Sequence, residues 1–252
     1  MKSEAASFLL AVQFLTRVPI GRLNVYTPER MTAATRYYPL VGALVGGFCA
    51  LMFVASDTAL PTAVAVLLSI AAGLLLTGAF HEDGLADTFD GIGGGLTRER
   101  ALEIMRDSRL GTYGTLALVT ALAIKAAALI SMPTVMIPAA LITAHGLSRL
   151  SSIIVIATSR YVRDEGTGKP VAGGISFISL LVALVTGAAI VAIWCLLYPS
   201  LAITWALGAM VIGHGLMRVF FEPKLGGYTG DTLGAIQQAS EIGFYLGLLA
   251  WV

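Results

Sequence analysis

Three aspartates that lie close together in the chain are the residues whose type and spacing point most directly to chemistry. Asp83, Asp87 and Asp90 stand at positions i, i+4 and i+7, directly after a long apolar stretch. On a helix they would share one face, within about 60° of one another. Like charges crowded at a membrane surface repel one another, so this face is expected to need a divalent cation. Asp oxygens suit Mg2+ or Mn2+, ions that commonly hold substrate phosphates.

The residues just before these aspartates are further candidates. Glu82 is a candidate outer metal ligand, and His81 is a candidate outer ligand or proton carrier. The alternative interpretation is a solvated helix end with ordinary surface acids. An excess of acid over base in a short window punctuated by glycines favours the metal site. For His81 alone, a structural, hydrogen-bonded role agrees with the sequence equally well.

A basic segment follows the acids. The sequence predicts a short helix over 98–110, with Thr97 as its N-cap and Glu99 in its first turn. Arg106 and Arg109, at i and i+3 of that helix, would share a face. Guanidinium groups bind phosphate oxygens in a bidentate way, so this pair is predicted to clamp a pyrophosphate opposite the metal. The alternative is an ion-pair network with neighbouring acids and anchoring at the lipid headgroups.

A glycine-rich segment, 226–234, precedes the last apolar run. Its glycines, Gly230 among them, let the backbone come close to a ligand. Asp231 is predicted to cap the last helix. Gln238 and Glu241, at i and i+3 within the apolar run, indicate a polar face turned into a helix bundle. Intramembrane acids are functional by default, although a helix cap with interfacial polar residues is the simpler alternative.

Other charged residues are isolated in apolar surroundings. Arg36, beside two tyrosines, is either an interfacial anchor or a substrate contact. Lys125 and Arg149 lie within predicted spans, so they should face the bundle or extend toward the interface. His145 and His214 are expected to be packing residues rather than ligands.

The composition places these motifs in a membrane protein. Of 252 residues, 57% are hydrophobic and 12% charged, about half the charge content of a soluble domain. The net charge of +1 gives no field that would attract nucleic acid. Cys49 and Cys195 lie inside apolar runs and are expected to be packing residues rather than a disulfide or metal pair. We expect one catalytic domain over 1–252.

Apolar runs near the length of a bilayer crossing recur along the chain. They predict an all-α polytopic fold with about seven transmembrane helices, in which Gly42 and Gly46 form a small packing surface. Residues 3–20 are predicted to form an N-terminal helix that is partly inserted, interfacial or an eighth span. The predicted spans are 38–56, 60–80, 112–131, 135–158, 176–198, 200–221 and 234–252.

The connections between these runs are of two kinds. Those at 57–61, 132–134 and 199 are short and nearly uncharged, whereas the longer ones carry most of the charges. With seven crossings the two kinds alternate, so the charged connections fall on one face. The positive-inside rule makes that face cytoplasmic. We therefore expect the active site at the cytoplasmic face of a prokaryotic inner membrane.

Five sequence blocks, taken together and in this order, resemble one family. They are Phe14–Pro19, Arg36–Gly42, Phe80–Gly91, Met105–Gly114 and Gly230–Gln238. The chain resembles cobalamin synthase, the adenosylcobinamide-GDP ribazoletransferase family, from residue 8 to the C-terminus. The blocks with the pattern HxDGLADxxDG and MRDSRLGxxG are specific, and the acidic positions show no departure from the family pattern.

The resemblance implies a Mg2+-dependent enzyme of the lipid bilayer. It would join adenosylcobinamide-GDP to alpha-ribazole or its 5'-phosphate and release GMP, in assembly of the cobalamin nucleotide loop. Metal and arginines would stabilise charge on the transferring phosphoryl group. Asp90 is the aspartate that we expect to accept the hydroxyl proton, with Asp87 as the next candidate. Other cobalamin-assembly enzymes and a second copy of the chain are possible partners.

Two other functions remain open from the residues alone. A CDP-alcohol phosphotransferase also uses clustered aspartates at a membrane surface, but its spacing of glycine and arginine between the acids differs. A divalent cation transporter would place acids mid-helix in facing repeats. Here most acids lie in the predicted cytoplasmic loops. The sequence leaves open the oligomeric state, the preferred form of ribazole and the identity of the base.

Overall fold

The fold is helical, as the sequence predicts. A computed structural model describes residues 2–20, 26–163 and 173–251, and within them the β-structure is confined to one bridge between Tyr161 and Tyr228. The helices in chain order are α1 (Lys2–Leu15), α2 (Pro28–Ala34), the 3-10 turn η1 (Thr35–Tyr37), α3 (Tyr38–Asp57), α4 (Thr62–Thr77), α5 (Phe80–Gly94), α6 (Arg98–Ile104), α7 (Thr112–Ile130), η2 (Thr134–Met136), α8 (Ile137–Thr158), α9 (Phe177–Leu197), α10 (Ala202–Leu225) and α11 (Gly230–Leu249).

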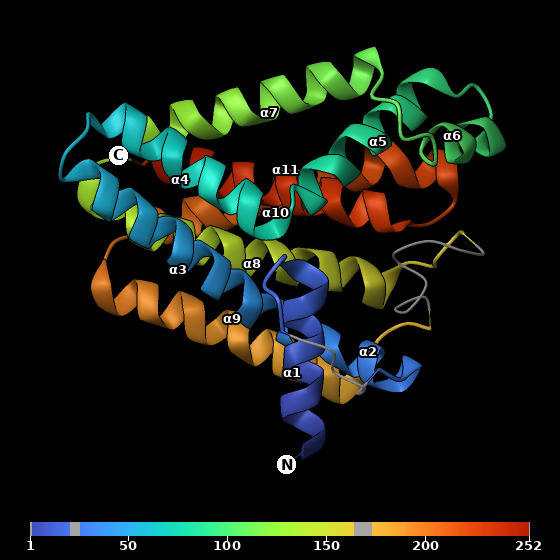
Figure 1. The fold of residues 1–252 in the computed structure, drawn as a ribbon, viewed down its shortest axis with the longest axis horizontal. Helices are drawn as coiled ribbons and strands as arrows, with labels where there is room; N and C mark the ends of the chain where they lie inside the picture. Colours follow the sequence, from blue (N-terminus) through green and yellow to red (C-terminus); the bar gives the residue numbers. More distant parts are fainter. Residues whose placement is uncertain (1, 21–25, 164–172, 252) are drawn as a thin grey trace.

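The long helices form an elongated bundle. Helices α3, α7, α8, α9, α10 and α11 run along the long axis of Figure 1. Helix α11 is the central element, because it packs against α5, α7, α8 and α10. Most of its residues from Thr232 to Leu248 are buried. The last helix therefore forms the core against which the candidate site is built.

Several helices are long and apolar enough to cross a membrane. Among the described residues these are Pro28–Asp57, Thr112–Ile130, Thr134–Thr158, Phe177–Leu197 and Ala202–Leu225. Helices α4 and α5 meet the same criteria only as a pair bent by 87°, which is either a broken sixth span or a re-entrant loop. The polytopic fold is confirmed, whereas the number seven is not. Helix α1, within the predicted segment 3–20, is one of the shorter apolar helices.

Helix α11 explains part of the difference in number. It falls outside that apolar set although 234–252 is a predicted span, because Gln237, Gln238 and Glu241 lower its hydropathy. All three side chains are buried inside the bundle. A helix surrounded by other helices has little contact with lipid, so its polar groups are satisfied by protein instead.

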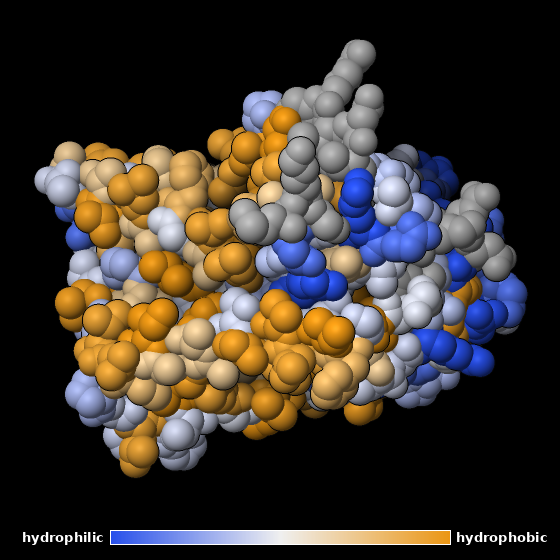
Figure 2. Space-filling view, turned by 90° about the horizontal axis from the view of Figure 1, so that it is seen from below, coloured by the Kyte–Doolittle hydropathy of each residue, from blue (hydrophilic) through white to orange (hydrophobic). Residues whose placement is uncertain are grey.

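The two ends of the bundle differ in polarity. Figure 2 shows apolar side chains over the left and centre of the molecule, and hydrophilic residues gathered toward the right end. Helix α6 lies at that right end in Figure 1, whereas the C-terminus lies at the left. The predicted separation of charged from uncharged connections therefore agrees with the fold.

Close helix packing requires glycine at the predicted positions in α3. A Cβ at Gly42 would lie 2.3 Å from the carbonyl oxygen of His145, and one at Gly46 would lie 2.5 Å from that of Leu141. The backbones of α3 and α8 therefore approach too closely for any larger side chain. The packing surface predicted at Gly42 and Gly46 is confirmed.

The bend between α4 and α5 brings the acids into position. Gly78 has φ 67° and Ala79 has φ 55°, both left-handed, and they end α4 and begin α5. Arg17 covers this bend, since its backbone N–H donates to the carbonyl of Leu76 at 2.7 Å. Helix α5 thereby leaves the direction of α4 and lies across the start of α11.

Candidate functional site

The acid-bearing helix meets the last helix at two glycines. A Cβ at Gly84 of α5 would lie 2.7 Å from the carbonyl oxygen of Asp231, and one at Gly234 of α11 would lie 2.9 Å from that of His81. Only glycine, which has no Cβ, fits at these two positions of the crossing. The contact places the face of α5 that carries Asp83 and Asp87 beside the N-terminus of α11, joining two segments that the sequence presents as separate sites.

Three carboxylates gather at this crossing. Asp83 is exposed and Asp87 half-buried on α5, and the negative charges of both Asp231 and Asp83 act on Asp87. Asp231 is paired with Arg163, whose Nη1 lies 2.7 Å from its Oδ2. Burial raises the pKa of Asp231, against the opposing effect of the Arg163 charge. The structure therefore brings Asp231, predicted as a substrate contact, to the predicted metal face.

Asp90 points to another helix. Its Oδ2 accepts the backbone N–H of Gly111 at 2.7 Å, and its Oδ1 accepts that of Gly114 at 2.8 Å. Gly111 is the N-cap residue of α7 and has no side chain to cap the helix, and Gly114 lies in the first turn. Asp90 thus supplies the cap from outside, where the helix dipole favours negative charge.

Glu82 turns into the bundle rather than toward the aspartates. Its Oε1 accepts from Nε2 of Gln238 at 2.9 Å and lies 3.9 Å from Nζ of Lys125. Lys125 also lies 3.0 Å from Glu241 and donates to Gln238 at 3.0 Å. The predicted ligand set of Asp83, Asp87, Asp90 and Glu82 is therefore divided among three environments.

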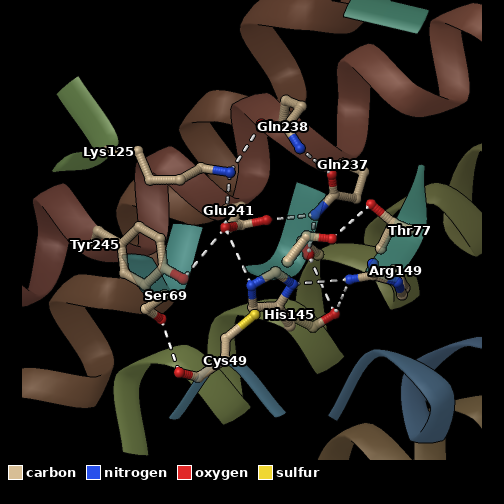
Figure 3. A network of polar contacts seen from close by, with 12 residues as sticks. Cys49, Ser69, Thr77, Lys125, His145, Arg149, Gln237, Gln238, Glu241 and Tyr245 are labelled. Carbon is tan, nitrogen blue, oxygen red and sulfur yellow. Dashed lines mark hydrogen bonds and ion pairs between the residues drawn. The ribbon is translucent and has the colours of Figure 1, made fainter. Parts of the chain in front are cut away.

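Glu82 belongs to a buried polar network, most of whose residues appear in Figure 3. Glu241 accepts from Gln237 at 2.6 Å and from the hydroxyl of Tyr245 at 3.2 Å. Nε2 of His145 lies 3.7 Å from Glu241, while its Nδ1 lies 3.2 Å from Nη1 of Arg149. Since arginine only donates, that contact assigns the neutral His145 proton to Nε2. The predicted polar face of α11 is confirmed, and of the two directions left open for Lys125 and Arg149 the structure shows the inward one.

His81 is buried in the first turn of α5. Its ring packs edge-on against Phe80 at 5.3 Å between centroids. It lines a cavity of about 20 Å³ together with Glu82 and Arg149, roughly the space that one water molecule needs. This placement is compatible with either the structural or the proton-carrying role that the sequence leaves open.

The predicted arginine clamp has a different local structure from the one expected. Helix α6 ends at Ile104, so the predicted helix 98–110 is too long, although Thr97 does cap it by accepting from the N–H of Arg100. Arg106 and Arg109 therefore lie beyond the helix and do not share a helical face. Arg109 is exposed and paired with Asp107 at 2.5 Å, and this bond lowers the pKa of Asp107 to about 2.

The structure also shows the contacts of Arg36 and Asp231, two further residues predicted to bind substrate. Arg36 pairs with Glu4 at 3.1 Å and donates to Ser179 at 3.2 Å, which joins α1 to α9. The N-cap of α11 is Thr229, in a capping box with Thr232, so the prediction that Asp231 caps this helix is wrong. Asp231 stands in the first turn, where its charge is favoured by the helix dipole.

The donor chemistry at the crossing fits Mg2+. This ion is usually held by one or two carboxylates, with waters and substrate phosphates completing its shell. Asp83, Asp87 and Asp231 supply hard oxygen donors, and their mutual repulsion would fall on binding a cation. In the described part of the chain no three His, Cys, Asp or Glu side chains are grouped so that they could hold an ion by themselves.

Two features of the site could not be expected from the sequence reasoning. By sequence Arg163 is one of several cations in a connection, and Tyr245 is one aromatic residue in an apolar run. The only sequence signal for Arg163 is its position just after a predicted span, at the charge-rich end. Its pairing with Asp231 depends on the fold.

The fold and the comparison with known proteins together identify the family of this chain. An all-helical bundle with several apolar helices long enough to span a membrane, and acids at its polar end, defines a polytopic membrane protein. The chain belongs to the cobalamin-5-phosphate synthase family, whose family model matches residues 7–249. No solved structure matches the chain.

Curated relatives cover almost the full length. A protein of Leptothrix cholodnii is 46% identical over 256 residues, covering 99% of this chain and 97% of the relative. One of Shewanella baltica (strain OS185) is 43% identical, with 98% and 94% covered. One of Shewanella woodyi is 41% identical, with 100% and 98% covered. Each is named adenosylcobinamide-GDP ribazoletransferase. Family membership favours this enzyme class over the phosphotransferase and transporter alternatives.

Proposed function

We propose that this protein transfers the phosphate-linked cobinamide group from adenosylcobinamide-GDP to alpha-ribazole or its 5'-phosphate, with release of GMP. The ribazole hydroxyl attacks the phosphorus that bears the cobinamide, and the bond to GMP breaks. The observation that carries the proposal is the crossing of α5 and α11, which gathers Asp83, Asp87 and Asp231 at the polar end of a chain of this family.

In this proposal one or two of Asp83, Asp87 and Asp231 hold Mg2+, with waters and the substrate phosphates completing its shell and with Mn2+ as a substitute. The ion would neutralise negative charge on the pyrophosphate during transfer. The support is the donor chemistry and the repulsion among the three acids. Glu82 is left out of this set, because its described contacts are with Lys125 and Gln238.

Asp87 replaces Asp90 as the proposed acceptor of the hydroxyl proton. Both oxygens of Asp90 already accept backbone N–H groups of α7, so we assign Asp90 the role of holding that helix. Asp87 is half-buried beside Asp231, on the face where the pyrophosphate would meet the metal, so its carboxylate would lie close enough to accept the hydroxyl proton.

The proposed location is the inner membrane of a prokaryote, with the site open to the cytoplasm. The support is the gathering of charged residues at one end of the bundle (Figure 2) and the positive-inside rule. A GDP-activated substrate is charged and would reach the acids from water rather than from lipid.

The direct test is GMP release from adenosylcobinamide-GDP by purified protein with Mg2+, assayed with each form of ribazole. We expect release that needs a ribazole acceptor and stops when EDTA removes the metal. Labelled CDP-diacylglycerol with an alcohol acceptor tests the rival phosphotransferase. Transfer to that alcohol without GMP release from the cobinamide substrate would refute the proposal.

A further inference from the structure

Arg163 has an arrangement that its ion pair does not explain. Its side chain is 6% exposed, and Nη1 bonds Asp231 at 2.7 Å. Nε and Nη2 are buried and have no hydrogen-bond partner among the residues that the structure describes. Leaving buried donors unpaired costs free energy, so two such donors on one charged group indicate an absent acceptor.

The two unpartnered atoms form one edge of the guanidinium group. Nε–H and the adjacent Nη2–H point the same way and match two oxygens of a phosphate or carboxylate. Arg218 shows the same edge in use, since its Nε lies 2.9 Å and its Nη2 lies 2.8 Å from the two oxygens of Glu222. The corresponding edge of Arg163 is therefore suited to an anion with two oxygens.

The backbone around Arg163 is fixed against the start of α11. The N–H of Val162 donates to the carbonyl of Tyr228 at 3.0 Å, and the N–H of Tyr228 donates to that of Arg160 at 2.8 Å. A Cβ at Gly227 would lie 2.2 Å from the carbonyl oxygen of Arg160, so this pairing requires glycine. The backbone that leads to Arg163 is thus fixed by hydrogen bonds to the segment before α11.

The surroundings favour a phosphate that is accompanied by a divalent cation. Arg163 stands beside the N-terminus of the 20-residue helix α11, where backbone N–H groups and the dipole attract anions. When ionised, Asp83, Asp87 and Asp231 exceed the charge of Arg163 by two, which is the charge of one Mg2+. An anion without the cation would meet net repulsion.

We propose that Arg163 binds two oxygens of the pyrophosphate in the GDP-activated substrate through Nε and Nη2, beside a divalent cation held by the acids. This assignment rests on the proposed function and deepens it. It gives Arg163 the role predicted for Arg106 and Arg109, which lie in the exposed turn after α6.

Kinetics of Arg163→Lys test the assignment, because lysine keeps the charge and loses the two-donor edge. The KM for adenosylcobinamide-GDP should rise about tenfold or more, whereas the KM for ribazole changes little. Arg218→Lys is the matched control, since it loses the same edge at a pair outside the site, and neither KM should change. Equal rises for both substrates in Arg163→Lys would overturn the assignment.

Binding of inorganic pyrophosphate with Mg2+ separates this proposal from the proposed function, because it needs no turnover. Pyrophosphate should raise the unfolding temperature of the wild type and of Arg218→Lys, but not of Arg163→Lys. If pyrophosphate stabilises the wild type and Arg218→Lys but not Arg163→Lys, and no GMP is released, the anion site at Arg163 stands and the proposed function is wrong. If GMP is released and Arg163→Lys leaves the KM for adenosylcobinamide-GDP unchanged, the proposed function stands and the assignment of Arg163 is wrong.

Hydrogen exchange on the wild type gives a readout that does not depend on a variant folding. Pyrophosphate with Mg2+ should slow amide exchange over 226–233, where the segment of Arg163 is paired. Slowing over 105–110 without slowing over 226–233 would overturn the assignment in favour of Arg106 and Arg109.

Discussion

Asp90 holds the first turn of α7 by accepting the backbone N–H of Gly111, with 2.7 Å between Oδ2 and the nitrogen. The fit is tight, because a Cβ on Gly111 would lie 2.4 Å from Oδ1 of Asp90. A Cβ on Gly114 would lie equally close to Oδ2. The contact therefore requires both glycines as well as the aspartate, and it links the acid-bearing helix α5 to the spanning helix α7.

Asp90→Asn should therefore lower stability as well as activity. The amide presents an NH2 group to one of two backbone donors, which costs about 1–3 kcal/mol. Asp83→Asn is the comparison, since Asp83 is exposed. It should abolish turnover while leaving the unfolding temperature of the detergent-solubilised protein unchanged. Equal unfolding temperatures for the two variants would contradict the capping role of Asp90.

The neighbouring glycines of α3 provide a matched pair. Gly46→Ala places a methyl group 2.5 Å from the carbonyl oxygen of Leu141, whereas nothing lies within 4 Å of a Cβ at Gly47. We expect Gly46→Ala to cost about 1–3 kcal/mol through overpacking. Gly47→Ala should be neutral or stabilising, because alanine favours helix. Thermal unfolding measures both, and a destabilised Gly47→Ala would argue against the described packing.

Lys125 is the cation that joins two buried acids. Lys125→Met would leave Glu241 and Glu82 without that partner, and removing one member of a buried ion pair costs about 3–5 kcal/mol. The double variant Lys125→Met with Glu241→Gln should recover part of this loss, because the uncompensated charge is removed. Thermal unfolding of the single and double variants completes the cycle. Additive losses would mean that the two residues act independently.

The attachment of α1 should depend on pH. The hydroxyl of Tyr37 donates to Glu4 at 2.5 Å, and this bond, helped by the charge of Arg36, lowers the pKa of Glu4. A lowered pKa stabilises the folded state above the unfolded value of about 4.3. This contribution is lost as the pH falls through the lower folded value. Amide exchange in α1, corrected for its intrinsic pH dependence, should quicken at pH 3 relative to pH 6. Glu4→Gln should remove that difference.

Labelling of single cysteines tests the topology. Leu96 is 96% exposed in the turn before α6, and Thr134 is exposed at the opposite connection. With Cys49 and Cys195 replaced by alanine, Leu96→Cys should resist impermeant thiol reagents added to intact cells, and Thr134→Cys should react. Outside labelling at position 96 would reverse the orientation and remove the proposed access to a cytoplasmic substrate.

Features with a local or periodic cause could be predicted from the sequence. These include the helical fold, the packing face at Gly42 and Gly46, and the inward polar face of α11. The division between Asp83 and Glu82 could not be predicted, because both lie next to each other in an acidic run. The bend at Gly78 and the crossing at Gly84 send one side chain to the surface and the other into the bundle. The pairing of Arg163 could not be predicted, because its partner, Asp231, is distant in the chain.

The adjacency of Glu82 and Asp83 has a mechanical consequence. Glu82 is held by Gln238 and Lys125 inside the bundle, and Asp83 is the next residue along α5. The position of the surface carboxylates is therefore fixed by the contact with the spanning helix α7 and not by the flanking loops. The plane in which substrate would meet metal is set by the depth at which α7 rests in the bilayer.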